Sequence, residues 1–332
     1  MRFAANSRLF TRLTCVVACA LSTFTSTDVF AQGYPSRPIR LIVPYAPGGG
    51  TDYFARTVAN ELGTQLGQAI VVENRPGAAT IIGADAAAKA PPDGYTVLVA
   101  DSTTIAVNPS LYKKLPYSPT RDFLPVTLTA RFAMVLVVSP LRSNASNLRE
   151  FLAESKAKPG ELSYASVGSG TTHHLTMELL KQRSGVTLNH VPYKGTGPAI
   201  QDLVGGQVSA MFVDLAGGAA MIKANKIKAL GVASAQRSAA LPSVPTLAEQ
   251  GLQDFDAWAW QGLVVPAGTA SDVVRKLSEA YARAIADPAI RRKLLEAGIE
   301  PVSSSPDEMA RYVSSETRKW AQVIKDAGVT VD

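Results

Sequence analysis

The sequence has 332 residues, more than one hydrophobic core usually organises and suited to two domains. With 46% apolar and 18% charged residues, it is a globular chain rather than a disordered one. Its formal charge is +6. No uncharged apolar stretch reaches about 18 residues, which excludes a membrane span. The two cysteines, Cys15 and Cys19, lie near the start, which excludes a disulfide framework and a cysteine-based zinc or redox site.

Residues 1–31 have the pattern of an export signal. Basic residues come first, an apolar run from Leu13 to Leu21 follows, and Val29-Phe30-Ala31 fits the cleavage pattern. We expect cleavage after Ala31 and a periplasmic protein. The alternative is a lipoprotein cut before Cys19, which would leave a very short apolar region. A mature chain without cysteine suits an oxidising periplasm.

Strands and helices alternate over the first part of the mature chain. Short β-branched runs between turn residues predict strands, and apolar residues at helical spacing, such as Phe54, Val58 and Leu62, predict helices. The expected order is strand 38–44, loop 45–51, helix 52–66, strand 69–73, a helix ending at 90 and strand 95–100. Such a βαβαβ unit predicts a parallel sheet with right-handed crossovers.

The alternation resumes in the second part of the chain. We expect strands 133–138, 162–167, 188–191, 208–213 and 227–232, a helix over 147–157, and two helices ending at 184 and 204. Trp258 and Trp260 mark a crossover strand, where they are core residues or, for one of them, pocket lining. The remaining third is mainly helical, with a capping box at Ser305–Glu308. No low-complexity linker separates the halves, so we expect the chain to cross between domains by strands.

Three strand-to-helix junctions are rich in glycine, serine and threonine: residues 47–51, 168–172 and 195–197. Glycine allows close backbone approach, and a helix N-terminus offers free N–H groups to an anion. A single loop of this kind is more often an ordinary turn, but three of them in both halves favour a ligand cleft. The spacing fits neither phosphate-binding fingerprint, and we expect Asp52 to stabilise the first turn of its own helix. A carboxylate suits these donors better.

Ordered motifs along the whole mature chain resemble the Bug (Bordetella uptake gene) family of periplasmic solute-binding proteins of tripartite tricarboxylate transporters. The matching segments include residues 34–39, 43–49, 72–78, 92–96, 168–171 with 174–175, 191–195, 226–230 and 242–246. The resemblance implies an α/β, two-lobed Venus flytrap of type II topology, each lobe a central sheet flanked by helices. Lobe one is expected at residues 32–131 plus 258–332, and lobe two at 132–257.

Family members hold one ligand carboxylate with backbone groups and waters from the first glycine loop and from a lobe-two loop. The corresponding candidate ligand-binding residues here are Tyr45, Pro47, Gly48, Gly49, Thr51, Ser102, Thr103, Ser169, Thr171, Thr172, His173, Tyr193, Gly195, Thr196 and Asp214. We expect a monomeric binding protein that passes a small carboxylate to membrane subunits and that uses no cofactor. The contrasting hypothesis is a secreted α/β enzyme acting on a similar acid, but no well-placed general base is recognisable.

Two acids, Asp101 and Asp214, follow predicted strand ends. Either one is a capping or solvated residue, or it faces the cleft, where it would disfavour a second carboxylate and suit an amine. His173 and His174 diverge on a helix and cannot share a metal, so we expect none. The basic run at residues 291–293 is interpreted as a solvated helix face, not a nucleic-acid site. The ligand is left open among aliphatic di- or tricarboxylates, aromatic acids such as terephthalate, and amino acids.

Overall fold

The computed structural model describes residues 33–331, so the expected export signal and its cleavage site lie outside the described residues. The chain divides into two units, Met1–Ser36 and Arg37–Asp332, and every helix and strand among the described residues lies in the second unit. Within residues 33–331, no helix is both long and apolar enough to cross a bilayer.

The first sheet region has the strand order β2-β1-β3-β9-β4. It contains β1 (Ile39–Val43), β2 (Ile70–Asn74), β3 (Thr96–Asp101), β9 (Trp258–Pro266) and the first part of β4 (Phe123–Val138). β1 is parallel to β2 and β3, as the βαβαβ pattern predicts, whereas β9 is antiparallel to both β3 and β4. The short β10 (Glu300–Pro301) pairs with β4.

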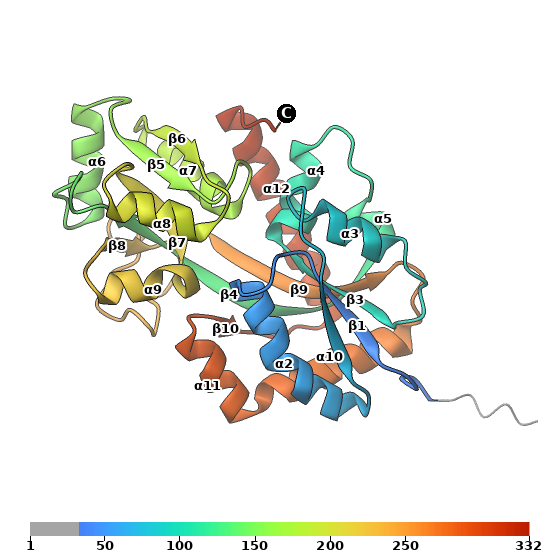
Figure 1. Ribbon diagram of the computed structural model, residues 1–332. Coiled ribbons are helices and arrows are strands. Elements are labelled where there is room, and N and C mark those ends of the chain that lie inside the picture. The colour runs from blue at the N-terminus through green and yellow to red at the C-terminus, as the bar shows by residue number, and fades with distance from the viewer. Residues whose placement is uncertain (1–32, 332) are drawn as a thin grey trace, which may run out of the picture. The chain divides into compact units, whose positions relative to one another are not determined.

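The second sheet region continues through β4 to β7, β5 and β6. These strands are β5 (Ser163–Ser166), β6 (Asn189–Pro192) and β7 (Ala210–Asp214), and β8 (Lys228–Val232) also pairs with β4. β4 changes partners along its length: its residues up to Ala133 pair with β9, and those from Met134 pair with β7 and β8. Figure 1 shows β4 and β9 running side by side across the molecule.

Helices flank both sheet regions, which confirms the predicted α/β class. Their bounds are α2 Gly50–Leu66, α3 Ile81–Ala88, η1 Thr103–Val107, α4 Asn108–Leu111, α5 Pro119–Asp122, α6 Leu148–Ala157, α7 Thr172–Ser184, α8 Thr196–Val204, α9 Leu215–Lys223, α10 Ser271–Ala286, α11 Pro288–Glu296 and α12 Pro306–Ala327. The predicted capping box opens α12, because Ser305 and Glu308 bond each other's backbone reciprocally. α12 packs against β4, η1 and α7.

The predicted start of β4 at Ala133 is wrong, since the strand begins at Phe123. Thr127 and Thr129 interrupt the apolar pattern there, yet both are fully buried. Their hydroxyls bond backbone carbonyls, Thr127 that of Leu128 and Thr129 that of Gln261 in β9. Satisfied in this way, polar side chains fit inside a sheet, which alternation of hydrophobicity alone cannot reveal.

Candidate functional site

Four helices begin where strands end, and their first residues lie close together. α2 follows β1, α7 follows β5, α8 follows β6 and α9 follows β7. A Cβ atom on Gly50, the first residue of α2, would lie 4.0 Å from the Cβ of Ala216 in α9 and 3.5 Å from the ring of Phe132 in β4. A Cβ on Gly217 in α9 would lie 2.8 Å from the methyl group of Thr196 in α8. Three helix N-termini are therefore in direct proximity.

Two side-chain contacts bring the start of α7 into the same group. The hydroxyls of Thr172 and Ser102, both buried, are 2.8 Å apart, which joins α7 to the loop after β3. Nε2 of His173 lies 3.2 Å from Oδ2 of Asp214, the residue that precedes α9. Because helix N-termini carry partial positive charge and free N–H groups, this neighbourhood favours an anion.

The β1–α2 loop is held by the carboxylate of Asp52, a residue in the first turn of α2. Asp52 accepts hydrogen bonds from the Gly48 N–H at 2.9 Å, from Arg56 Nε at 3.1 Å and from Asn74 Nδ2 at 2.8 Å. Burial alone would raise the pKa of Asp52, but these bonds outweigh it and hold that pKa below its usual value. The N-cap residue Gly49 supplies no side-chain cap, and residues 46–50 are exposed. The loop is thus held from behind while its outer N–H groups face open space.

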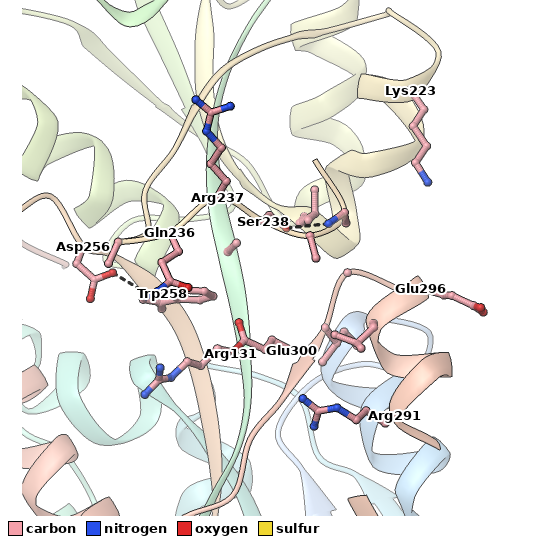
Figure 2. Close-up of a pocket in the computed structure, with 18 residues that line it drawn as sticks. Arg131, Lys223, Gln236, Arg237, Ser238, Asp256, Trp258, Arg291, Glu296 and Glu300 are labelled. Atoms are coloured by element: carbon pink, nitrogen blue, oxygen red, sulfur yellow. Dashed lines mark hydrogen bonds between the residues drawn. The ribbon is translucent and has the colours of Figure 1, made fainter. Parts of the chain in front are cut away.

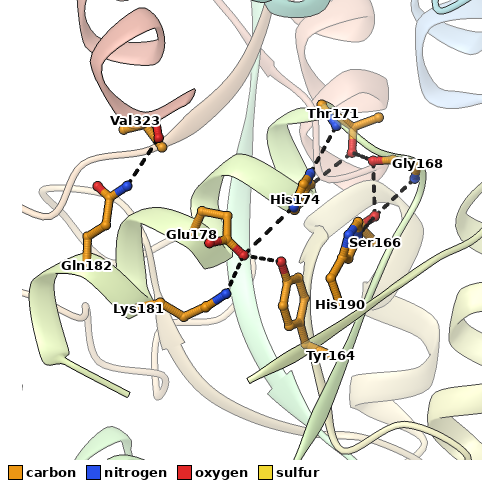
Figure 3. Close-up of polar contacts among 11 residues, drawn as sticks. Tyr164, Ser166, Gly168, Thr171, His174, Glu178, Lys181, Gln182, His190 and Val323 are labelled. Carbon is orange, nitrogen blue, oxygen red and sulfur yellow. Dashed lines mark hydrogen bonds and ion pairs between the residues drawn. The ribbon is translucent and has the colours of Figure 1, made fainter. Parts of the chain in front are cut away.

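The β5–α7 loop is instead bonded by side chains throughout (Figure 3). The Ser166 hydroxyl accepts from the Gly168 N–H at 3.2 Å and lies 3.0 Å from the Gly168 carbonyl oxygen. Nδ1 of His174 accepts from the Gly170 N–H at 3.0 Å. Thr171 donates to the Gly168 carbonyl at 2.8 Å and caps α7 with the same oxygen. The loop is therefore fixed by the strand before it and the helix after it.

A buried polar cluster behind this loop keeps His174 in its accepting form. The rings of His174 and His190 stack with centroids 3.8 Å apart, and the Glu178 carboxylate accepts from the Tyr164 hydroxyl and from Lys181 Nζ (Figure 3). Burial, followed by the proximity of His190 and Lys181, lowers the pKa of His174 to about 3. Burial also lowers the pKa of His190. Both imidazoles are therefore neutral, and Nδ1 of His174 can accept the loop N–H.

Asp214 is a capping residue of α9. Its Oδ1 accepts from the Gly217 N–H at 2.7 Å, while Oδ2 lies against His173. Burial alone would raise the pKa of Asp214, but the bonds from His173 and Gly217 outweigh it and hold the pKa below its usual value. The carboxylate is thus ionised and partnered within the protein.

Asp101 at the end of β3 is also partnered. It accepts from the Tyr45 hydroxyl and from the N–H and hydroxyl of Thr104, at 2.8 and 2.6 Å. Burial, with the Asp101 charge second, raises the pKa of Tyr45 well above its usual value, so the phenol remains a donor. All three of these donors to Asp101 are uncharged groups.

The remaining candidate residues are distributed around this neighbourhood. Thr103 contacts the Tyr45 hydroxyl, whereas the Tyr193 hydroxyl donates to Asp202 at 2.6 Å and its ring packs against the core. The other candidate residues range from exposed to half-buried: Pro47, Ser169, Thr51 and Gly195. Direct ligand contact by any of the candidates stays a prediction.

A separate open cavity of about 920 Å³ lies among β4, β9, α9, α11 and residues 235–240 (Figure 2). It contains none of the predicted ligand-binding residues, although Trp258, weighed above as pocket lining, is part of its wall. Sequence reasoning missed Arg131, whose guanidinium carbon lies 5.9 Å from the Trp258 ring centroid and 5.2 Å from that of Tyr312. Both signs of charge line the cavity, so its electrostatics select neither anion nor cation. Among residues 33–331 no cluster of His, Cys, Asp or Glu is arranged to hold a metal ion.

The family model described as "Tripartite tricarboxylate transporter family receptor" matches residues 54–329. Protein BugT of Bordetella pertussis is 37% identical over 96% of this chain and 98% of its own length. A structure of an R. palustris protein with adipate is 34% identical, covers 90% of this chain and 99% of its own, and has a TM-score of 0.82. MatC from Rhodopseudomonas palustris with bound malate is 34% identical, covers 88% and 100%, and has a TM-score of 0.77. The two structures match 90% and 88% of this chain, and they confirm the predicted periplasmic-binding-protein fold.

Proposed function

Because the chain belongs to the tripartite tricarboxylate transporter receptor family, a family of solute-binding proteins rather than enzymes, we propose that it captures a small carboxylate in the periplasm and delivers it to the membrane subunits of such a transporter. Two of its structural relatives, both from R. palustris, were solved with adipate and with malate, which are carboxylates. The proposal assigns the carboxylate site to the neighbourhood where α2, α7, α8 and α9 begin.

One observation carries this assignment: α2 starts at an exposed glycine loop with no side-chain cap, beside the start of α9, which in turn lies beside the start of α8. Free N–H groups at a helix N-terminus are suited to a carboxylate without any arginine. Hydrogen bonds to a charged group contribute about 1.5–3 kcal/mol each. Four or five of them suffice for a micromolar complex of about −8 kcal/mol after the costs of association.

The proposal includes closure of two lobes over the ligand. Lobe one comprises residues 32–131 and 258–332, lobe two comprises residues 132–257, and the hinge lies near Ala130 and Trp258. The change of partners along β4 supports this division, because the two ends of that strand belong to different sheet regions. A tight ligand should reduce the radius of gyration in solution scattering, and superimposable curves with and without it would count against closure.

The carboxylate itself is tested by comparing acids with their amides. In a thermal-shift screen, ligand at about 100 times its Kd adds roughly 2.7 kcal/mol to the free energy of unfolding. We expect at least one small acid to raise Tm by several degrees. Calorimetry should then show that its primary amide or methyl ester binds far more weakly. Equal binding of acid and amide would place the recognition elsewhere, and conversion of the bound acid to a product would favour the enzyme hypothesis.

We further propose export with cleavage after Ala31, as the sequence pattern indicates. Mass spectrometry of the periplasmic protein should find Gln32 at its N-terminus. An acylated Cys19 would instead establish the lipoprotein.

A further inference from the structure

Gln261 in β9 is a buried amide without a hydrogen-bonding partner. The residue is 1% exposed, and neither Oε1 nor Nε2 of its side chain bonds any other described residue. A buried amide left in this way is costly to the folded protein, because both its donor and its acceptor have lost water. Such a group in a native structure calls for an explanation, and a bound molecule is one.

Strand register places this amide on the face of the sheet that lies below the candidate site. Gln261 is directly opposite Asp101 in β3, and directly opposed residues of antiparallel strands point to the same face. The adjacent pair, Ala100 and Gly262, lies on the other face, where Met309 of α12 would contact a Cβ on Gly262. Gln261 therefore shares its face with Asp101, which holds the Tyr45 hydroxyl.

The other neighbour of β9 leads to the start of α2. Gln261 is opposite Ala130 in β4, and Phe132, two residues further along β4, lies on that same face. The ring of Phe132 is the one that lies 3.5 Å from a Cβ placed on Gly50. The unpartnered amide thus sits between the Tyr45–Asp101 pair and the uncapped N-terminus of α2.

The geometry points to Gln261 as the residue that recognises the end of the ligand opposite to its bound carboxylate, an inference that rests on the function proposed above. It also points to an acid in which that far end is a hydroxyl or carboxamide rather than a second carboxylate. An amide offers one acceptor and two donors, which a hydroxyl or carboxamide satisfies in both directions. A carboxylate only accepts, and it would lie near the Asp101 carboxylate, whose partners Tyr45 and Thr104 are neutral.

The test uses two matched series of acids in calorimetry: succinate, succinamate and butyrate, and terephthalate, 4-carbamoylbenzoate and 4-methylbenzoate. In the series that fits the site, we expect the carbamoyl acid to bind wild-type protein at least tenfold more tightly than either partner. Gln261→Met should abolish that preference while the methyl-ended acid binds as well or better. It should also raise Tm of the ligand-free protein, because a costly buried amide is removed.

Gln250→Met is the matched control, because the side-chain amide of this half-buried residue is bonded to backbone groups of Leu230, Thr246 and Leu148 and the residue lies outside β3, β4 and β9. It should lower Tm and leave the ratio of affinities unchanged. If Gln261→Met instead lowers Tm and weakens all acids equally, Gln261 holds a structural water only and the inference is wrong. Tighter binding of the dicarboxylates by the wild type would also overturn it while leaving the proposed function intact. If wild type binds none of these acids, the inference is wrong, and the proposed function fails only if the whole thermal-shift screen also finds no carboxylate that binds.

Discussion

The two glycine-rich loops that follow β1 and β5 differ in how their backbone groups are satisfied. In the β1–α2 loop, Asp52 holds Gly48 from behind, and the N-cap glycine leaves the helix without a side-chain cap. In the β5–α7 loop, Ser166, Thr171 and His174 each bond a backbone group of the loop. A loop whose donors are already used is positioned by the protein, whereas a loop with open donors is available to a ligand.

The glycines of the two loops reflect the same difference. A Cβ on Gly49 would meet no atom within 4 Å, and its φ of −82° is accessible to any residue. Gly170 has φ of +75°, and its Cβ would lie 2.2 Å from a methyl group of Leu111. Substitution at Gly49 should therefore affect mainly binding, and substitution at Gly170 should affect mainly stability.

The largest effect is expected at the open loop. Gly49→Val should weaken carboxylate binding at least a hundredfold, because the branched side chain blocks approach to the N–H groups of α2. Tm of the ligand-free variant should stay within about 1–2 °C of wild type, since there is space for the side chain. Calorimetry and thermal unfolding check the two halves of this prediction. Undiminished binding by Gly49→Val would mean that the β1–α2 loop does not hold the carboxylate.

The next effect concerns acid stability of the fixed loop. The pKa of His174 is about 3 in the folded protein and about 6.5 when unfolded, so only the unfolded state takes up a proton as pH falls below 6.5. As pH falls from about 6.5 towards about 3, His174 should therefore lower the free energy of unfolding by about 1.4 kcal/mol per pH unit.

His174→Asn keeps an acceptor for the Gly170 N–H and cannot titrate. The free energy of unfolding is measured by urea denaturation at about pH 6.5 and about pH 5. Between these two pH values it should fall by roughly 2 kcal/mol less in the variant than in wild type. Equal losses would show that His174 is already protonated in the folded state. Asp52 and Asp214, with lowered pKa values, lose their stabilising charge only at lower pH and are present in both proteins.

A smaller loss is expected at Gly170, the counterpart of Gly49. Gly170→Ala should lower the free energy of unfolding by about 1–2 kcal/mol, because alanine strains the positive φ and Leu111 must move. The fraction of protein that binds ligand should be unchanged at low temperature. A variant as stable as wild type would contradict the fixed geometry assigned to this loop.

The smallest effect is expected for Thr171→Ala. Thr171 caps α7 and bonds the Gly168 carbonyl, so its loss should cost about 1 kcal/mol of stability and roughly tenfold in affinity. Thr171→Ser, which retains the hydroxyl, is the control and should restore both quantities. If Thr171→Ala and Gly49→Val both bind like wild type, the carboxylate is held elsewhere.

Local patterns in the sequence determined much of this protein. Alternation of apolar runs and helical spacing predicted the βα units, and the Ser305–Glu308 box predicted the start of α12. Each glycine loop was located between a strand and a helix, and the ordered motifs led to the family. These features depend on residues a few positions apart, which propensity and periodicity describe well.

The tertiary structure alone decided which residues work together. The long β4 contains buried threonines, one of which, Thr129, bonds a carbonyl of the distant strand β9, so its first ten residues escaped prediction. His173 and His174 are adjacent in sequence, yet they have different partners. His173 contacts Asp214, the N-cap residue of α9, whereas His174 accepts a hydrogen bond from the Gly170 N–H in the β5–α7 loop. Gln261 shows no motif at all, and only its register with Asp101 and Ala130 places it beneath the start of α2. Such partnerships are set by register and packing between segments far apart in the chain, where burial and hydrogen bonding are settled only once the sheet has formed.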